Sequence, residues 1–222
     1  MTDNKKNLEK NQKKKNQYEF YIKHERPEEF AGDPLEFYTS KRVNEYAQSK
    51  ALMRIQERIA KRALEIAQIE PPARVLDLGM GCGFASTYML LNHFQVVGID
   101  INFLFLTYYN IQKLNPLQTD MRDMGFRKNS FDLIISISAI QWILAEKKEI
   151  KRLKFLKSLA DQCSIILNHG GKIVFQFYPK SDSAMHEVGK VFSDTEKFNG
   201  NFIIDNPDNP KKRKIYLYLE KK

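Results

Sequence analysis

An aspartate that ends an apolar run, followed by glycines at alternate positions, is the part of this chain whose chemistry can be read most directly. Residues 75–83 read Val-Leu-Asp-Leu-Gly-Met-Gly-Cys-Gly, and the residues of interest are Asp77, Gly79, Gly81 and Gly83. Glycines tolerate positive φ and let a ligand approach the backbone without a clash from Cβ. A second apolar run ends at Asp100, about twenty residues on, where an acidic residue accepts hydrogen bonds from ribose hydroxyls. These residues predict a nucleotide site.

The spacing of the glycines indicates which nucleotide. A dinucleotide site prefers Gly-x-Gly-x-x-Gly, which seats a pyrophosphate on a helix N-terminus. Here the third glycine comes one residue early, and position 84 is Phe. A carboxylate at Asp77 would repel a pyrophosphate but suits an ammonium group. A ribose plus a cationic amine, without phosphate, describes S-adenosyl-L-methionine, and the pattern resembles the fingerprint of class I methyltransferases.

Strands alternating with helices must position these residues. Apolar runs and helical periodicity predict strands over 74–78, 94–99, 131–138, 172–177, 202–204 and 214–219, and helices over 42–69, 84–91, 101–112, 146–167 and 184–192. The helical stretch 42–69 is predicted to be two helices or one bent helix, which Pro71-Pro72 ends. Gly170-Gly171 is predicted to end the helix over 146–167. The alternation, closed by a hairpin, predicts an α/β fold with a doubly wound sheet.

Composition bounds the domain organisation and the partners. The 222 residues fit one α/β domain with short additions. Residues 1–25 are rich in Lys, Asn, Gln and Glu and are predicted to be a disordered tail. A methyltransferase domain is predicted over 26–222, with a helical cap at 38–69 and a core at 73–222. The net charge of +9 suggests a polyanionic partner such as nucleic acid, and the alternative is simply solvated lysines.

Other classes of protein are disfavoured. Two cysteines, Cys82 and Cys163, argue against a disulfide scaffold and fit a reducing compartment. The four histidines have no metal-ligand spacing with them, so no intrinsic metal site is predicted. No apolar stretch is long enough to span a membrane, and no secretory signal is visible, so no membrane partner is expected.

Three further stretches resemble one particular family. They are residues 131–142 (Phe-Asp-Leu-Ile-Ile-Ser-Ile-Ser-Ala-Ile-Gln-Trp), Gly170-Gly171-Lys172 with residues 176–180 (Gln-Phe-Tyr-Pro-Lys), and Asp205-Asn206-Pro207 with residues 211–217. In order and spacing they resemble the small-subunit ribosomal RNA (guanine-N7) methyltransferases of eukaryotes and archaea, a ribosome-biogenesis family. The resemblance runs from about residue 34 to residue 219, and it implies a seven-stranded class I methyltransferase (Rossmann-like) fold.

The same resemblance implies a protein partner. Members of the family work with a small zinc-binding activator subunit, which would pair with an edge strand near residues 116–119 and cover apolar surface. The proline at 116 independently indicates an edge strand. The activator would explain the consecutive apolar residues 103–106, for which a deeply covered helix is the alternative. Zinc would then belong to the partner.

Roles for the cofactor site follow from the pattern and the resemblance. Gly79, Gly81 and Gly83 let the backbone approach the cofactor. Asp77 orients the methionine ammonium, directly or through water, and Asp100 with the adjacent Ile101 takes the ribose. By analogy with the family, Asp120 and Met121 flank the adenine, with Asp120 accepting from its exocyclic amine. Tyr46 is predicted either to close over the cofactor or to pack in the core.

The resemblance also suggests residues for the acceptor. Ser136 and Ser138 are predicted to line the pocket beside the transferred methyl group. Trp142 or Tyr178 is predicted to stack on an unpaired guanine, the alternative for each being a buried core aromatic. Lys180 and the basic residues 211–214 are candidate phosphate contacts. No His/Asp dyad is needed, because guanine N7 is a lone-pair nucleophile.

The predicted function is therefore S-adenosylmethionine-dependent methylation of guanine N7 in small-subunit ribosomal RNA. The alternatives are a methyltransferase acting on a small molecule or a protein, and a ribosome-assembly factor whose binding role outweighs its catalysis. The chain departs from eukaryotic members in ending at Lys222 without a basic C-terminal tail, and in carrying Met80 where a cysteine is common. These departures favour an archaeal, cytoplasmic protein; a eukaryotic one would be nuclear or nucleolar.

Overall fold

The computed structural model describes residues 26–108 and 116–222. The predicted tail over 1–25 and the end of the helix predicted over 101–112 lie outside the described residues. The strands are β1 (Arg74–Leu78), β2 (Gln95–Asp100), β3 (Leu117–Gln118), β4 (Phe131–Ile137), β5 (Leu167–Phe177), β6 (Phe198–Asp205) and β7 (Lys214–Lys221). The helices are α2 (Pro27–Ala31), α3 (Pro34–Phe37), α4 (Ser40–Ala47), α5 (Lys50–Ala67), α6 (Phe84–Leu91), α7 (Phe103–Leu106), α8 (Gln141–Leu144), α9 (Glu149–Ile166) and α10 (Asp182–Ser193).

The strands form one seven-stranded sheet in the order β3-β2-β1-β4-β5-β7-β6. Strands β3, β2, β1, β4 and β5 are parallel to one another, whereas β7 is antiparallel to both β5 and β6. The central strands are continuous apolar runs because both faces of the sheet are covered. The predicted doubly wound, seven-stranded fold is confirmed, and β3 is an edge strand as predicted.

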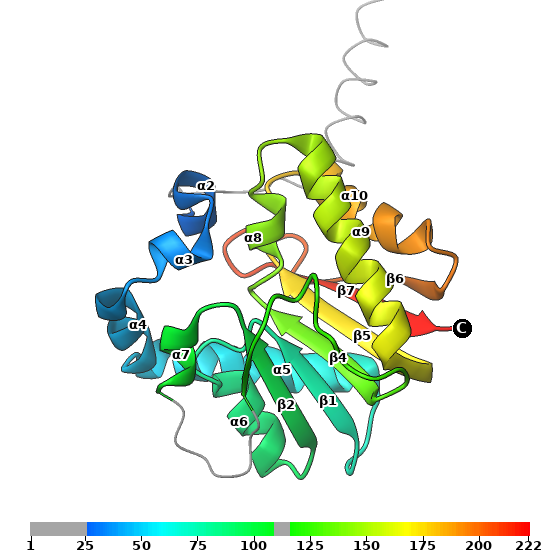
Figure 1. Cartoon of the computed structure of the whole chain (residues 1–222), viewed down its shortest axis with the longest axis horizontal. Helices are drawn as coiled ribbons and strands as arrows, with labels where there is room; N and C mark the ends of the chain where they lie inside the picture. Colours follow the sequence, from blue (N-terminus) through cyan, green and yellow to red (C-terminus); the bar gives the residue numbers. More distant parts are fainter. Residues whose placement is uncertain (1–25, 109–115) are drawn as a thin grey trace, which may run out of the picture.

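Two layers of helices cover the sheet (Figure 1). On one face, α9 and α10 pack on a core cluster that includes Leu76, Ile134 and Phe175. On the other face, α5 and α6 pack on a cluster that includes Val75, Ile135 and Val174. The alternation of these residues along each strand follows from the two-residue period of a strand. Both layers leave the carboxyl ends of β1, β2 and β4 free to carry a site.

The N-terminal helices lie beside those carboxyl ends (Figure 1). The predicted helical stretch 42–69 is two helices, α4 and α5, separated at Gln48 and Ser49. The Ser49 hydroxyl accepts a hydrogen bond from the Leu52 N–H at 3.3 Å, so Ser49 caps α5. Preceding them, α2 and α3 are one-turn helices in the segment 26–37. Among the described residues, no helix combines the length and the apolar character needed to cross a bilayer.

One predicted boundary is wrong. Gly170-Gly171 does not end the helix over 146–167, because α9 already ends at Ile166 and β5 begins at Leu167. The two glycines lie inside β5, with Gly170 at φ 68° and an irregular register against β4 between Phe131 and Leu133. A side chain at Gly171 would meet Asn168 O at 2.8 Å, so close backbone approach explains that glycine better than a helix cap does.

Candidate active site

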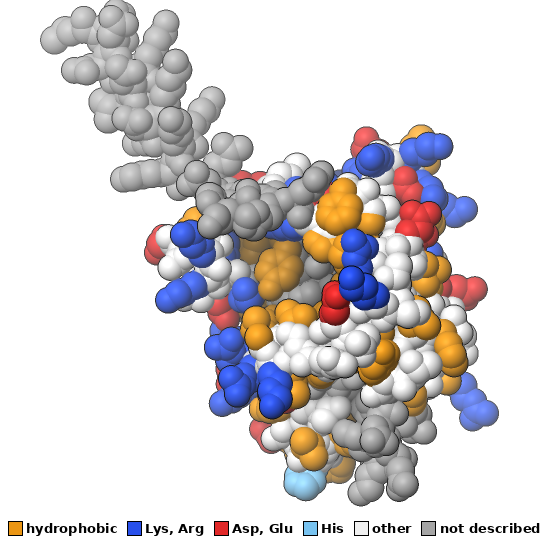
Figure 2. Space-filling model, turned by 90° about the vertical axis from the view of Figure 1, so that its left-hand side faces the viewer, with side chains coloured by type: hydrophobic (Ala, Val, Ile, Leu, Met, Phe, Trp, Pro, Cys, Tyr) orange, Lys and Arg blue, Asp and Glu red, His pale blue; other side chains and the backbone are white. Residues whose placement is uncertain are grey.

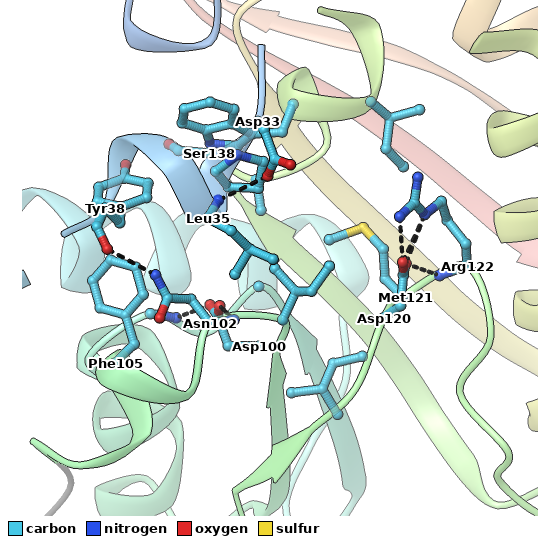
Figure 3. Close-up of a pocket in the computed structure, with 18 of the residues that line it drawn as sticks. Asp33, Leu35, Tyr38, Asp100, Asn102, Phe105, Asp120, Met121, Arg122 and Ser138 are labelled. Atoms are coloured by element: carbon cyan, nitrogen blue, oxygen red, sulfur yellow. Dashed lines mark hydrogen bonds and ion pairs between the residues drawn. The ribbon is translucent and has the colours of Figure 1, made fainter. Parts of the chain in front are cut away.

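A cavity of about 480 Å³ opens at the carboxyl ends of β1, β2 and β4. Its walls come from the glycine loop, the ends of β2 and β3, the turn after β4, and the segment 32–38. In open α/β sheets, ligands bind at this edge. Figure 3 shows Asp33 and Ser138 on one side, Asp100 and Asn102 at the floor, and Asp120 with Arg122 across the cavity.

The glycine loop forms one wall. Gly79 and Gly81 line the cavity at φ 72° and 55°. A Cβ at Gly79 would lie 2.4 Å from the Ala139 Cβ, so this position needs glycine for both conformation and space. Gly83 does not line the cavity; it is buried, with φ 77°, and its N–H donates to Met80 O at 2.9 Å. Gly83 therefore shapes the loop at the start of α6.

Asp100 sits at the cavity floor in the position that the sequence predicts. Its Oδ2 accepts from the Gly81 N–H and its Oδ1 from the Asn102 N–H, both at 2.9 Å. Burial raises the pKa of Asp100, while the backbone N–H donors oppose the rise. Ile101 also lines the cavity. The carboxylate is thus held rigidly, with remaining lone pairs for hydroxyl donors.

Asp77 does not line the cavity. It is 1% exposed, and its Oδ2 accepts a hydrogen bond from the Ser86 hydroxyl at 2.6 Å. Burial raises the pKa of Asp77 to about 6, against the opposing effect of Ser86. The Asp77 side chain lies under the glycine loop, so it is out of direct contact with a ligand in this cavity. A contact between Asp77 and the methionine ammonium through water stays a prediction.

Asp120 and Met121 line the opposite wall. The Arg122 guanidinium engages both carboxylate oxygens of Asp120, with Nε 2.8 Å from Oδ1, and lies 4.1 Å from the centroid of the Phe155 ring. Burial would raise the pKa of Asp120, but its hydrogen bonds to Arg122 lower it overall. The carboxylate predicted to accept from an adenine amine therefore already has a cationic partner.

The two serines at the end of β4 differ, since Ser136 lies in the strand and Ser138 follows it. Ser138 lines the cavity, whereas Ser136 is fully buried and its hydroxyl donates to Leu78 O at 2.9 Å, which ties β4 to β1. Trp142 lines the cavity, with its ring centroid 5.8 Å from that of Phe37 and 5.7 Å from that of Tyr38. Ser138 and Trp142 are therefore brought together, and Ser136 lies behind them.

The two predicted tyrosines also differ. Tyr46 lines the cavity and stacks on Phe84 with centroids 5.7 Å apart, and burial raises its pKa. Tyr178 does not line the cavity. Arg26 lies 5.7 Å and Lys214 Nζ 5.2 Å from the centroid of the Tyr178 ring, and Arg26 donates to the Tyr178 carbonyl. Because these two cations lie close to the Tyr178 ring, the ring is poorly placed to stack on a base.

Sequence reasoning missed the segment 32–38, which closes the cavity from the N-terminal side. Asp33, Leu35 and Tyr38 line the cavity, and the Tyr38 carbonyl accepts from Asn102 Nδ2 at 2.9 Å. Figure 3 shows these residues facing the ends of β2 and β4. The Asp33 carboxylate accepts from the Leu35 N–H at 2.8 Å, an N-cap that the order Asp-Pro could have suggested.

The fold and the cavity define a class I methyltransferase. Residues 76–175 match the model of the family described as "Methyltransferase domain". A TehB-like S-adenosylmethionine-dependent methyltransferase from Corynebacterium glutamicum superposes with a TM-score of 0.63 at 18% identity, over 83% of this chain and 100% of that one. That likeness supports the fold.

The relatives narrow the class. The 18S rRNA (guanine-N(7))-methyltransferase bud23 of Schizosaccharomyces pombe is 31% identical over 88% of this chain and 74% of its own length. The 18S rRNA (guanine(1575)-N(7))-methyltransferase of Saccharomyces cerevisiae is 33% identical over 82% of this chain and 68% of its own length. The chain belongs to the 18S rRNA (guanine-N(7))-methyltransferase family.

This membership corrects one expectation. The relatives named for 18S rRNA are eukaryotic, so the archaeal reading drawn from the chain's departures at Met80 and Lys222 finds no support. The identity of one loop residue and the position at which the given sequence ends are weak guides to origin. In the part of the chain that the structure describes, no group of three or more His, Cys, Asp or Glu could hold a metal ion.

Proposed function

We propose that this protein transfers a methyl group from S-adenosyl-L-methionine to N7 of a guanine in small-subunit ribosomal RNA during ribosome biogenesis. The observation that carries the proposal is the identity of about a third, over most of the chain, to enzymes named for that reaction. The cavity at the carboxyl edge of the sheet supports it, because its wall includes Asp100, the glycine loop and an aromatic side chain.

The residues present fit the methyl donor. The backbone is open to a ligand at Gly81, where a Cβ would meet only the Tyr46 ring at 3.9 Å, whereas Ala139 already fills the Cβ position of Gly79. Asp100 would take ribose hydroxyls, beside Ile101. Met121 and Asp120 would flank the adenine, and the Arg122 partner of Asp120 would have to share that carboxylate. Asp77 would act on the ammonium through water and Tyr46 would cover the cofactor. When bound, S-adenosylmethionine supplies an electrophilic methyl group on a sulfonium.

The chain's own contribution to the transfer is positioning. Guanine N7 attacks with a lone pair, so no side chain needs to remove a proton first. Trp142 would stack on the base, Ser138 would lie beside the reacting atoms, and the segment 32–38 would exclude water. Ser136, with its hydroxyl held by Leu78 O, would support the wall rather than contact the base.

The charge distribution supports a nucleic-acid partner. On the face drawn in Figure 2, hydrophobic side chains border a hollow near the middle, and Lys and Arg side chains stand along the left-hand edge. The basic residues of α5 include Lys50, Arg54, Arg58 and Lys61, which are exposed. Arg62 instead pairs with Asp205 at 3.0 Å, and Lys180 lies 3.8 Å from Glu29. The exposed lysines and arginines of α5 are thus better phosphate candidates than Lys180.

We further propose that a small zinc-binding activator subunit pairs with the β3 edge. Leu117 on β3 is 44% exposed and Phe103 on α7 is 57% exposed, so apolar surface adjoins an unpaired strand edge. Co-expression with the activator should raise soluble yield. Replacing Leu117 by Lys should abolish the complex, whereas Ile150→Lys on the distant helix α9 should not. A stable, active monomer would overturn this proposal.

We propose residues 26–222 as the methyltransferase domain with residues 1–25 as a tail, and the nucleolus as its compartment, because the relatives act on 18S rRNA by name. Compartment is tested by imaging the tagged full chain. A cytoplasmic signal would contradict that part of the proposal without affecting the chemistry.

The decisive experiment incubates the full chain, with its activator, with labelled S-adenosylmethionine and small-subunit RNA. Chemical cleavage at N7-methylguanine should then reveal a single site. The Asp100→Ala variant should give no label, and Asn168→Leu, at the far end of β5, should label like wild type. Label on protein or small molecules alone would overturn the proposed function.

A further inference from the structure

Behind Ser138 in the cavity wall lies the buried amide of Gln176, which has no part in the proposed methyl transfer. Gln176 is in β5, paired with Ile137 of β4 on one side and Tyr216 of β7 on the other. Its side chain is fully buried. The Ser138 hydroxyl donates to Gln176 Oε1 at 2.9 Å, and the Ser138 N–H donates to the Gln176 carbonyl, also at 2.9 Å.

These two hydrogen bonds hold Ser138 in an unfavourable backbone conformation. Ser138 has φ 55°, in the left-handed region that is disfavoured for residues with a Cβ. Such residues persist where the surroundings over-determine them, and they concentrate at functional sites. Because one contact fixes the Ser138 backbone and the other fixes its hydroxyl, Gln176 decides where that hydroxyl lies and which way its proton points.

Gln176 is a poor choice for packing alone. Its Nε2 is buried and has no hydrogen-bond partner among the described residues. A buried donor without a partner destabilises the fold, and an unbranched apolar side chain of similar size would avoid that penalty. Buried polar groups without a hydrogen-bond partner are expected where function requires them. The carbonyl oxygen of the amide, which binds Ser138, is the part that an apolar side chain could not replace.

We propose that Gln176 is a positioning residue that fixes the polarity of the Ser138 hydroxyl, so that Oγ presents lone pairs to the base in the cavity. The inference rests on the proposed function. Methylation at N7 turns a neutral guanine into a cation, so an oxygen aimed at the base as an acceptor is favoured increasingly as the reaction proceeds. A hydroxyl proton aimed at the base would oppose the same change.

The test is a double-mutant cycle between Ser138→Ala and Gln176→Met, with Gln176→Glu as the conservative variant. Gln176→Met should lower kcat by about fivefold to tenfold, which is what one net hydrogen bond contributes, with little change in the KM for RNA. Gln176→Glu keeps an acceptor and should retain kcat within about threefold. In the Ser138→Ala background, Gln176→Met should have no further effect. Asn168→Leu, which removes an amide elsewhere on β5, should match wild type throughout.

Thermal unfolding without RNA separates this role from a structural one. Gln176→Met should unfold at the same temperature as wild type or higher, because the partnerless Nε2 is removed. A fall in both Tm and kcat, or an equal loss of kcat in the Ser138→Ala background, would overturn the inference. If the wild-type enzyme does not methylate RNA, the proposed function is overturned instead. In that case, a lowered Tm for Gln176→Met would still count against the inference.

Discussion

Replacing Asp77 by Asn should change how stability depends on pH. In the folded chain burial raises the pKa of Asp77 from 3.8 to about 6. Between those values the folded state holds a proton that the unfolded state releases, so this group makes wild type less stable as pH rises. At 1.36 kcal/mol per unit of pKa shift, the resulting loss of folding stability is about 3 kcal/mol. This loss is complete above pH 6 and absent below about pH 4.

The asparagine variant stays neutral throughout that range. Its side-chain oxygen still accepts from the Ser86 hydroxyl, and any cost of its added N–H₂ group is the same at every pH. The free energy of unfolding of Asp77→Asn minus that of wild type should therefore rise by about 3 kcal/mol between about pH 4 and pH 7. Urea unfolding at several pH values in this window measures the difference directly.

Thr87→Ala in α6, next to Ser86, is the control, because neither threonine nor alanine titrates. Its difference from wild type should be independent of pH. A flat difference for Asp77→Asn, within about 0.5 kcal/mol, would refute the reasoning, because the buried carboxylate would then ionise without penalty. A difference that falls with pH would mean that a cationic or donor group stabilises the carboxylate in the fold.

Three further predictions concern the cavity. Asp100→Asn leaves one oxygen for the two backbone N–H groups that the carboxylate now binds, so affinity for S-adenosylhomocysteine, measured by calorimetry, should fall at least about tenfold. Gly79→Ala places a Cβ 2.4 Å from a Cβ of the turn after β4 and should destabilise the chain by more than about 2 kcal/mol. Gly32→Ala, with similar φ but open space, should lose only about 1 kcal/mol; equal losses in denaturant unfolding would contradict this argument. Arg122→Leu should free Asp120 and tighten cofactor binding, and weaker binding by the same assay would show that Arg122 itself contacts the ligand.

The parts of the fold that depend on local pattern were predictable. Strand β1 and the glycine loop follow from an apolar run and from residues that tolerate positive φ, both of which are properties of neighbouring residues. The edge position of β3 followed from Pro116, whereas periodicity over 42–69 allowed either two helices or one bent helix, of which the structure has two. The boundary at Gly170-Gly171 was wrong because glycine inside a strand and glycine after a helix look alike without the pairing partners.

By itself, the sequence determined which residues end the strands, and hence that Asp100, Asp120, Ser138 and Trp142 meet at one edge of the sheet. Only the tertiary structure decided which way each side chain points: Asp77 turns under its loop to Ser86, and Tyr178 carries Arg26 and Lys214 instead of facing the cavity. It also brought the segment 32–38 over the site. Position along a strand is set by local periodicity, whereas side-chain direction and loop packing depend on partners that are distant in the chain.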